Sequence, residues 1–189
     1  MSKFQNIENK LERFIRKYYT NALLRGLILF FAFGVLYFLL TLLIEYFFWL
    51  STAGRAVLFW LFVGVEVALL VKFILIPLAR LFKLSKGINY EDAAQMIGSY
   101  FPEVSDKLIN TLQLKTEATS SELMLASVEQ KSAALEPIPF TLAIDFKKNV
   151  KYLKYAAIPI FVFLLANSIG KEAIFSSSYE RVVNYNEAY

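Results

Sequence analysis

The feature that most constrains this chain is an unbroken apolar run from Gly26 to Trp49, GLILFFAFGVLYFLLTLLIEYFFW. As a helix its 24 residues rise about 36 Å, enough to cross a hydrocarbon core of roughly 30 Å with some tilt. Its one carboxylate, Glu45, lies about one turn from the far end, where headgroups and water are close. The run therefore predicts a transmembrane helix.

A second apolar run, from Ala56 to Leu78, follows after a link of only six residues, LSTAGR. So short a link predicts an antiparallel hairpin. Aromatic side chains gather beside it, as is typical of the belt that anchors spans at an interface. They are Tyr46, Phe47, Trp49, Phe59 and Trp60. The chain is 57% hydrophobic, which favours lipid as the solvent of these runs.

A third apolar stretch, from Ala156 to Gly170, has 15 residues and by itself would suit a re-entrant or buried core helix. Tyr152, Leu153 and Tyr155 extend it backwards, while Lys151 and Lys154 can reach toward headgroups. The extended stretch, Tyr152 to Gly170, predicts a third span.

Charge predicts the orientation of these spans. Thirteen cations lie on one side of them and three on the other, and basic segments tend to stay in the cytoplasm. The N-terminus and the segment between spans two and three are therefore expected in the cytoplasm. The thirteen are Lys3, Lys10, Arg13, Arg16, Lys17, Arg25, Arg80, Lys83, Lys86, Lys147, Lys148, Lys151 and Lys154; the three are Arg55, Lys171 and Arg181.

The segment before the first span predicts an amphipathic helix. Its apolar residues recur at spacings of three and four and form one stripe: Phe4, Ile7, Leu11, Phe14 and Tyr18. Two interpretations stay open. The stripe packs on this chain's own cytoplasmic part or on the membrane surface, or it is a seam for a partner helix.

Residues 84–155 predict a compact insert with three helices. Asn89 is the expected cap of the first helix, which ends before Pro102, and Ser105 the expected cap of the second. The third is expected from about Ser120 to Leu135. The predicted inward residues are Tyr90, Ala93, Ala94, Ile97, Phe101, Leu108, Ile109, Leu112, Met124, Leu125, Val128 and Leu135.

A basic amphipathic helix is predicted after the Pro137–Pro139 elbow. Phe146, Val150, Leu153 and Ala157 share one face, and the other carries Lys147, Lys148, Lys151 and Lys154. Such a face suits anionic headgroups. Nucleic-acid binding is the rival interpretation, but a position beside the membrane already accounts for the lysines.

Glu66 lies near the centre of the second apolar run, where an acidic residue costs about 2.5–3.5 kcal/mol. Tyr37 lies about as far from the cytoplasmic end of the first apolar run as Glu66 does from that of the second. At equal depth, Tyr37 is the predicted hydrogen-bond donor to Glu66. Three roles stay open: a packing contact between helices, a proton or ion relay, and a contact with another subunit's span.

The sequence argues against an enzyme. It has no His and no Cys, so the commonest general base and thiolate chemistry are lacking. Phosphate-binding Gly-rich loops, paired acidic motifs and Ser/Lys catalytic patterns are not found either. No catalytic, cofactor or metal site is expected.

The order of these elements, the stretch FPEVSDKLINTLQL (101–114) and the ending SSSYERVVNYNEAY resemble the start of a family of large bacterial envelope proteins. That family is known only as a domain of unknown function. The resemblance implies that a long periplasmic region follows the third span. Its genes often lie near those of MoxR-type AAA+ ATPases and von Willebrand-type proteins, which implies a cytoplasmic AAA+ ATPase as a candidate partner.

The expected fold is all-α and integral to the membrane, with three transmembrane helices and a small cytoplasmic helical insert between the second and third. The expected parts are a cytoplasmic amphipathic helix (1–25), a transmembrane hairpin (26–83), the insert (84–150), the third span (151–170) and the periplasmic start of a longer region (171–189).

The expected function is a non-enzymatic anchor or scaffold subunit of the bacterial inner membrane. It would link a cytoplasmic partner to a periplasmic assembly. The alternative is a subunit of an oligomeric transporter or ion-conducting complex that uses Glu66. Expected partners are the bilayer and other membrane or envelope subunits, without nucleic acid.

Overall fold

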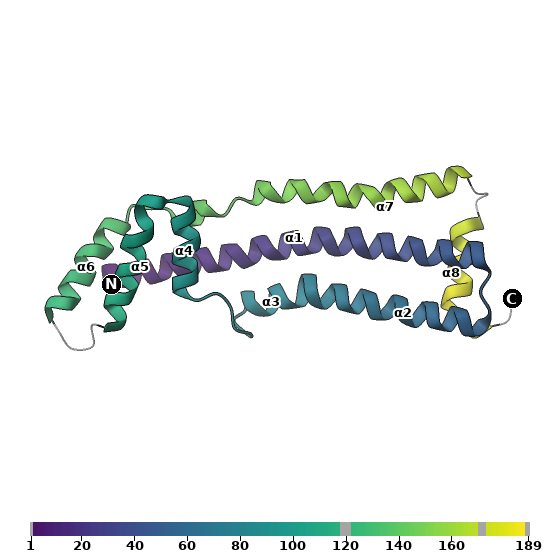
Figure 1. Cartoon of the computed structure of the whole chain (residues 1–189), viewed down its shortest axis with the longest axis horizontal. Helices are drawn as coiled ribbons and strands as arrows, with labels where there is room; N and C mark the ends of the chain where they lie inside the picture. Colours follow the sequence, from purple (N-terminus) through teal and green to yellow (C-terminus); the bar gives the residue numbers. More distant parts are fainter. Residues whose placement is uncertain (1, 118–121, 170–172, 188–189) are drawn as a thin grey trace. The chain divides into compact units, whose positions relative to one another are not determined.

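The computed structural model describes residues 2–117, 122–169 and 173–187, and every regular element within them is a helix (Figure 1). Three helical stretches are long and apolar enough to cross a membrane: Lys3–Phe48, Thr52–Leu81 and Phe140–Ser168. The all-helical class and three apolar helices are thus confirmed. The expected helix start at Ser120, the span end at Gly170, the cation Lys171 and the chain end at Tyr189 lie outside the described residues.

The chain divides into two compact units. Unit 1 comprises Met1–Asn21 and Ala79–Phe146, and unit 2 comprises Ala22–Leu78 and Lys147–Tyr189. The longest helix, α1 (Lys3–Phe48), contributes to both. The amphipathic helix and the first span, predicted as separate parts, are therefore one uninterrupted helix.

In unit 1 the start of α1 is buried among the short helices that gather around it (Figure 1). Phe4, Ile7, Leu11 and Phe14 are at most 5% exposed. They pack with residues of the insert, among them Ala93, Ala94, Ile97, Val104, Leu108, Leu112, Val128, Leu135 and Phe140. The structure thus favours the interpretation in which the stripe packs on this chain's own insert.

Tyr18 departs from that stripe. It is only partly buried, whereas Tyr19 is 4% exposed. A straight helix has 3.6 residues per turn and drifts by about 20° per heptad against a 3.5-residue repeat. After two heptads the inward position therefore falls between the two tyrosines, whose rings meet edge to face at 5.3 Å.

The helix α4 (Tyr90–Tyr100) begins as predicted. The Asn89 side chain accepts the backbone N–H of Asp92 at 2.6 Å, and the Asp92 carboxylate accepts the backbone N–H of Asn89 at 3.1 Å. This reciprocal pair is a capping box, which satisfies two amide groups that no helical carbonyl can reach.

The helix α5 (Pro102–Glu117) begins four residues earlier than predicted, so Ser105 is not its cap. Proline suits the first helical position because its fixed φ is already helical and its missing N–H has no partner to lose there. Ser105 instead packs on Gly98 of α4, where an added Cβ would lie 2.4 Å from its Oγ. The two helices approach closely at this point.

The helix α6 (Glu122–Leu135) turns a slightly different face inward than predicted. Val128 and Leu135 are buried, but Leu125 is 42% exposed and Ser132 is fully buried in its place. Residues 124, 128, 132 and 135 follow one face at helical spacing, and Leu125 lies at the outer edge of that face. The prediction for Leu125 is therefore wrong.

Two lysines of α1 hold the segment that follows α6, which includes the 3₁₀ turn η2 (Phe140–Ala143). Lys10 Nζ donates to the backbone carbonyls of Glu136 and Ile138 and lies 5.5 Å from the Phe140 ring centre. Burial lowers the pKa of Lys10, opposed by the charge of Glu136. Lys17 Nζ donates to the Thr141 carbonyl at 2.8 Å.

In unit 2, α1 packs closely against the second apolar helix. This helix runs without a break through α2 (Thr52–Leu70), the π-helical turn η1 (Val71–Leu75) and α3 (Ile76–Leu81). A Cβ added to Gly26 would lie 1.9 Å from the Phe73 carbonyl oxygen, so only glycine admits this approach of the two backbones. The contact falls within the π-helical turn.

The link between these helices is shorter than predicted. α2 begins at Thr52, capped by Ser51, whose Oγ accepts the Gly54 N–H at 3.4 Å. Trp49 turns the chain with φ of 45°, in the left-handed region. Arg55, predicted in the link, therefore lies in the first turn of α2 and is 3% exposed.

The third apolar helix, α7 (Val150–Ile169), follows a separate 3₁₀ turn, η3 (Phe146–Asn149). The predicted basic helix therefore begins four residues later, and Lys147 and Lys148 precede it. α7 meets α1 through Tyr155, whose ring centre lies 6.2 Å from that of Phe33.

A last helix, α8 (Ala173–Val183), packs against the three long helices of unit 2 (Figure 1). It contacts α2. Its Tyr179 ring lies 6.3 Å from Phe38 of α1, and its Phe175 ring stacks at 5.2 Å on Phe163 of α7. The end of the described chain thus folds back onto the bundle.

Candidate functional site

Glu66 of α2 lies against Gly34 of α1. A Cβ added to Gly34 would stand 2.9 Å from Glu66 Oε2 and 3.3 Å from Oε1. The glycine therefore makes the space that the carboxylate occupies. Oε1 is buried, and no residue in the described part of the chain forms a hydrogen bond with it.

The structure does not bring Tyr37 and Glu66 together. Tyr37 stacks on Phe62, with ring centres 6.1 Å apart and planes 15° apart, one turn away from Glu66 along α2. Depth matching by residue count took Gly26 and Leu78 as ends at the same level, whereas Gly26 lies against the Phe73 backbone, nearer to Glu66 along the second helix. Glu66 is therefore level with Gly34 rather than with Tyr37.

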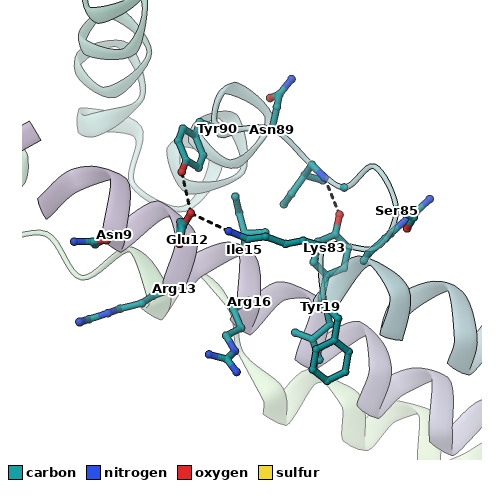
Figure 2. A pocket seen from close by; sticks show the side chains of 15 residues that line it. Asn9, Glu12, Arg13, Ile15, Arg16, Tyr19, Lys83, Ser85, Asn89 and Tyr90 are labelled. Carbon is teal, nitrogen blue, oxygen red and sulfur yellow. Dashed lines mark hydrogen bonds and ion pairs between the residues drawn. The ribbon is translucent and has the colours of Figure 1, made fainter. Parts of the chain in front are cut away.

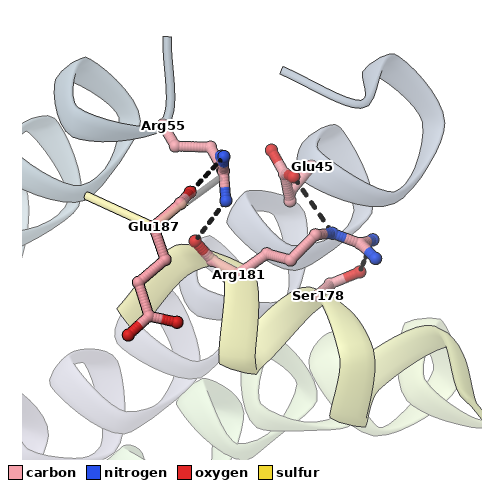
Figure 3. Close-up of polar contacts among 5 residues, drawn as sticks. All are labelled: Glu45, Arg55, Ser178, Arg181 and Glu187. Carbon is pink, nitrogen blue, oxygen red and sulfur yellow. Dashed lines mark hydrogen bonds and ion pairs between the residues drawn. The ribbon is translucent and has the colours of Figure 1, made fainter. Parts of the chain in front are cut away.

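A polar cluster joins α8 to the ends of α1 and α2 (Figure 3). Arg181 Nε donates to Glu45 Oε1 at 3.2 Å, and the two side chains are 8% and 1% exposed. Arg181 also reaches the Ser178 hydroxyl at 3.5 Å and lies 4.4 Å from the ring centre of Trp49. Its cation is thus held by a carboxylate, a hydroxyl and an aromatic face.

Arg55 completes this cluster from the first turn of α2. Its guanidinium donates to the carbonyl of Glu187 at 2.8 Å and to that of Arg181 at 3.5 Å (Figure 3). These carbonyls lie at the end of α8 and beyond it, where helical carbonyls lack N–H partners and attract cations. The cluster fixes α8 to the hairpin.

The sequence did not single out this cluster. Glu45 looked like an ordinary interfacial carboxylate, and Arg55 and Arg181 were counted only for orientation. The available signal was that each is a lone charge at the edge of an apolar run.

A pocket of about 890 Å³ lies in unit 1 between α1 and the segment that leads from α3 to α4 (Figure 2). Four cationic side chains line it, Arg13, Arg16, Arg80 and Lys83, against one carboxylate, Glu12. Lys83 Nζ pairs with Glu12 Oε1 at 2.9 Å, and the Tyr90 hydroxyl donates to the same oxygen at 3.2 Å.

These two donors control the ionisation of the pocket's acid. The hydrogen bond from Lys83 is the main cause that holds the pKa of Glu12 below its ordinary value. Burial, with the neighbouring Glu12 charge, raises the pKa of Tyr90. At neutral pH, Glu12 is therefore an anion paired with Lys83, and the other charged side chains of the lining, Arg13, Arg16 and Arg80, are cations.

The predicted basic face is separate from this pocket. Lys147, Lys148, Lys151 and Lys154 are all exposed, and none lines the pocket. Lys151 and Lys154 each lie over the ring of the tyrosine that follows, at 5.2 Å from Tyr152 and 5.1 Å from Tyr155.

Within residues 2–117, 122–169 and 173–187, no group of three or more His, Cys, Asp or Glu side chains could hold a metal ion. In comparisons with known proteins, no family model, no curated protein and no solved structure matches this chain. The structural class of the chain therefore rests on the structure alone: it is an all-helical protein with three helices long and apolar enough to span a membrane.

Proposed function

We propose that this chain is a non-enzymatic anchor or scaffold subunit of a bacterial inner membrane, linking a cytoplasmic partner to a periplasmic assembly. The observation that carries the proposal is that α1 is one continuous helix shared by two different parts of the chain. Its first four turns belong to the core of a polar helical unit, and the same helix continues as the first apolar stretch. A separately packed unit is thus joined without a linker to helices suited to a bilayer.

Two features support a role on both sides of the membrane. Unit 1 contains eight of the thirteen cations on the basic side, which favours the cytoplasm. α8 is fixed by the Glu45–Arg181 pair to the opposite end of the hairpin. In this proposal unit 1 receives the cytoplasmic partner, and the residues after α8 lead to the periplasmic one.

Unit 1 offers exposed apolar residues for such a partner. Leu123 of α6 is 85% exposed and Tyr100 of α4 is 54% exposed. The resemblance to large envelope proteins makes a cytoplasmic AAA+ ATPase one candidate. The buried stripe of α1 is not the partner site, because its residues already fill the unit's own core.

Site-specific photo-crosslinking in cells tests the proposal. A photoreactive residue at Leu123 should capture a cytoplasmic protein, and one at Asn186 a different, periplasmic protein. A residue at Val67, 52% exposed on α2, is the matched control and should capture neither soluble protein. Capture of the same soluble protein from Leu123 and Asn186 would contradict the linking role, as would release of the chain from membranes by alkaline carbonate.

A second candidate function, a subunit of an oligomeric ion- or proton-conducting complex, is favoured by Glu66. Its buried Oε1 has no hydrogen-bond partner in the described structure, and an unsatisfied acid in hydrocarbon is costly. Glu66→Gln keeps the shape and removes the ionisable group. A relay predicts loss of ion flux in proteoliposomes with unchanged photo-crosslinking, whereas a packing contact predicts that neither readout changes.

A further inference from the structure

We propose that the pocket between α1 and the α3–α4 segment binds the phosphate headgroup of an acidic glycerophospholipid. The inference rests on the proposed membrane insertion and adds a ligand class to unit 1. It arises from the charges in the pocket, one buried hydroxyl and the apolar residues at its edge.

The charges of the pocket are unbalanced. Glu12 is its single carboxylate and is occupied by Lys83 and Tyr90. In the part of the chain that the structure describes, Arg13, Arg16 and Arg80 have no side-chain ion-pair or hydrogen-bond partner. Guanidinium groups present paired N–H donors that match the oxygens of a phosphate, so an anion with several oxygens is the complementary ligand.

Tyr19 adds a neutral donor to the pocket wall. Its hydroxyl oxygen accepts the backbone N–H of Ile88 at 2.7 Å, which leaves the hydroxyl proton free to donate (Figure 2). The residue is only 4% exposed, and no acceptor for that proton is found among the described residues. Gly87 permits this approach, because an added Cβ would lie 2.8 Å from the hydroxyl oxygen.

The turn after α3 places apolar side chains beside these donors. It is a Schellman motif, in which the Leu84 N–H binds the Ala79 carbonyl at 2.8 Å and the Lys83 N–H binds that of Arg80 at 3.1 Å. Lys83 takes the left-handed position usually held by glycine, with φ of 59°. Phe82 and Leu84 are 62% and 80% exposed on either side of it.

This combination favours a lipid over a soluble phosphate. Large apolar side chains that flank a cation just after a candidate span are suited to acyl chains, while the cations meet the headgroup. Inorganic phosphate would use the arginines and Tyr19 but would leave Phe82 and Leu84 in water. Both sources share the phosphate chemistry, and the experiment separates them.

The test is a lipid titration of the full chain in mild detergent, followed by native mass spectrometry. The probes are phosphatidylglycerol, phosphatidylcholine and inorganic phosphate. The pocket variant is Arg13→Gln with Arg16→Gln and Arg80→Gln. The charge-matched control is Lys107→Gln with Lys115→Gln and Lys131→Gln, three exposed cations of unit 1 that do not line the pocket. Tyr19→Phe removes the hydroxyl without a change in net charge.

We expect the wild-type chain to prefer phosphatidylglycerol to phosphatidylcholine. One interfacial cation is worth about fivefold in affinity, so the pocket variant should bind phosphatidylglycerol about tenfold or more weakly. The control should stay about unchanged. Tyr19→Phe should weaken binding by about fivefold, the value of one hydrogen bond.

Equal losses in the pocket variant and the control would overturn the proposal, because binding would then follow overall charge. Lack of preference for phosphatidylglycerol would also overturn it. Displacement of the lipid by millimolar inorganic phosphate would overturn the lipid assignment. Carbonate extraction of the same proteins from membranes reports on insertion separately, so failure of the lipid site and failure of the anchor proposal are distinguishable.

Discussion

Gly26 and Gly64 are helical glycines with opposite surroundings. A Cβ on Gly26 would meet the Phe73 backbone at 1.9 Å, whereas a Cβ on Gly64 would meet nothing within 4 Å. The same substitution thus tests close packing at one site and helix propensity at the other. Gly34 is intermediate, because the atoms it would meet belong to the movable end of Glu66.

We expect Gly26→Ala to lower the free energy of unfolding in detergent by about 1–3 kcal/mol, since the helices must move apart. Gly64→Ala should be neutral or stabilise by up to about 1 kcal/mol, because alanine favours the helix. Thermal unfolding followed by circular dichroism measures both. Equal effects of the two substitutions would contradict the close approach at Gly26.

The Glu45–Arg181 pair is buried, so its two partners depend on one another. Glu45→Gln leaves the Arg181 cation without its carboxylate, and breaking a buried pair in this way costs about 3–5 kcal/mol. The double variant Glu45→Leu with Arg181→Met should lose much less than the sum of the single changes. Hydrogen exchange of the α8 amides reports the effect, and additive losses would show that the pair is not coupled.

At the scale of elements, helix starts could be predicted where a single local signal exists. Asn89 and Asp92 provide such a signal for α4, and in the structure they form the capping box at its start. The start of α5 was predicted after Ser105, because Pro102 was interpreted only as the end of the preceding helix; α5 begins at Pro102 instead, and Ser105 packs on Gly98. The start of α2 was missed because Ser51 caps it within a segment that looks like a link.

The N-terminus of α1 is tied to α6 by a carboxylate. Glu129 Oε2 accepts the backbone N–H of Lys3 at 2.8 Å, and this bond is the main cause that lowers the pKa of Glu129. A carboxyl group with a lowered folded-state pKa adds stability above its ordinary pKa of 4.5, and that stability disappears as the pH falls through the folded value.

Acid should therefore loosen this attachment. We expect fluorescence from a probe at Ser2 to report release of the helix start as the pH drops below about 4.5, the ordinary value. Glu129→Gln should show weaker attachment at neutral pH and a flatter pH dependence. If the fluorescence of Glu129→Gln changed with pH as that of the wild type does, Glu129 would be excluded as the titrating group.

For the whole molecule, the three apolar helices could be predicted because each is defined by a continuous run of residues. The register between them could not. It depends on the Gly26–Phe73 contact, which leaves Glu66 beside Gly34 instead of Tyr37. The Arg181–Glu45 pair joins residues 136 positions apart, and only the return of α8 onto the bundle brings them together.

The most direct test of the account is the topology of the chain in the membrane. The sequence has no cysteine, so each introduced cysteine is the only thiol. In spheroplasts treated with a membrane-impermeant maleimide, Ala53→Cys and Asn186→Cys should be labelled while the cells are intact, and Lys86→Cys only after lysis. Labelling of Lys86→Cys in intact spheroplasts, or of Ala53→Cys only after lysis, would contradict three spans with unit 1 in the cytoplasm.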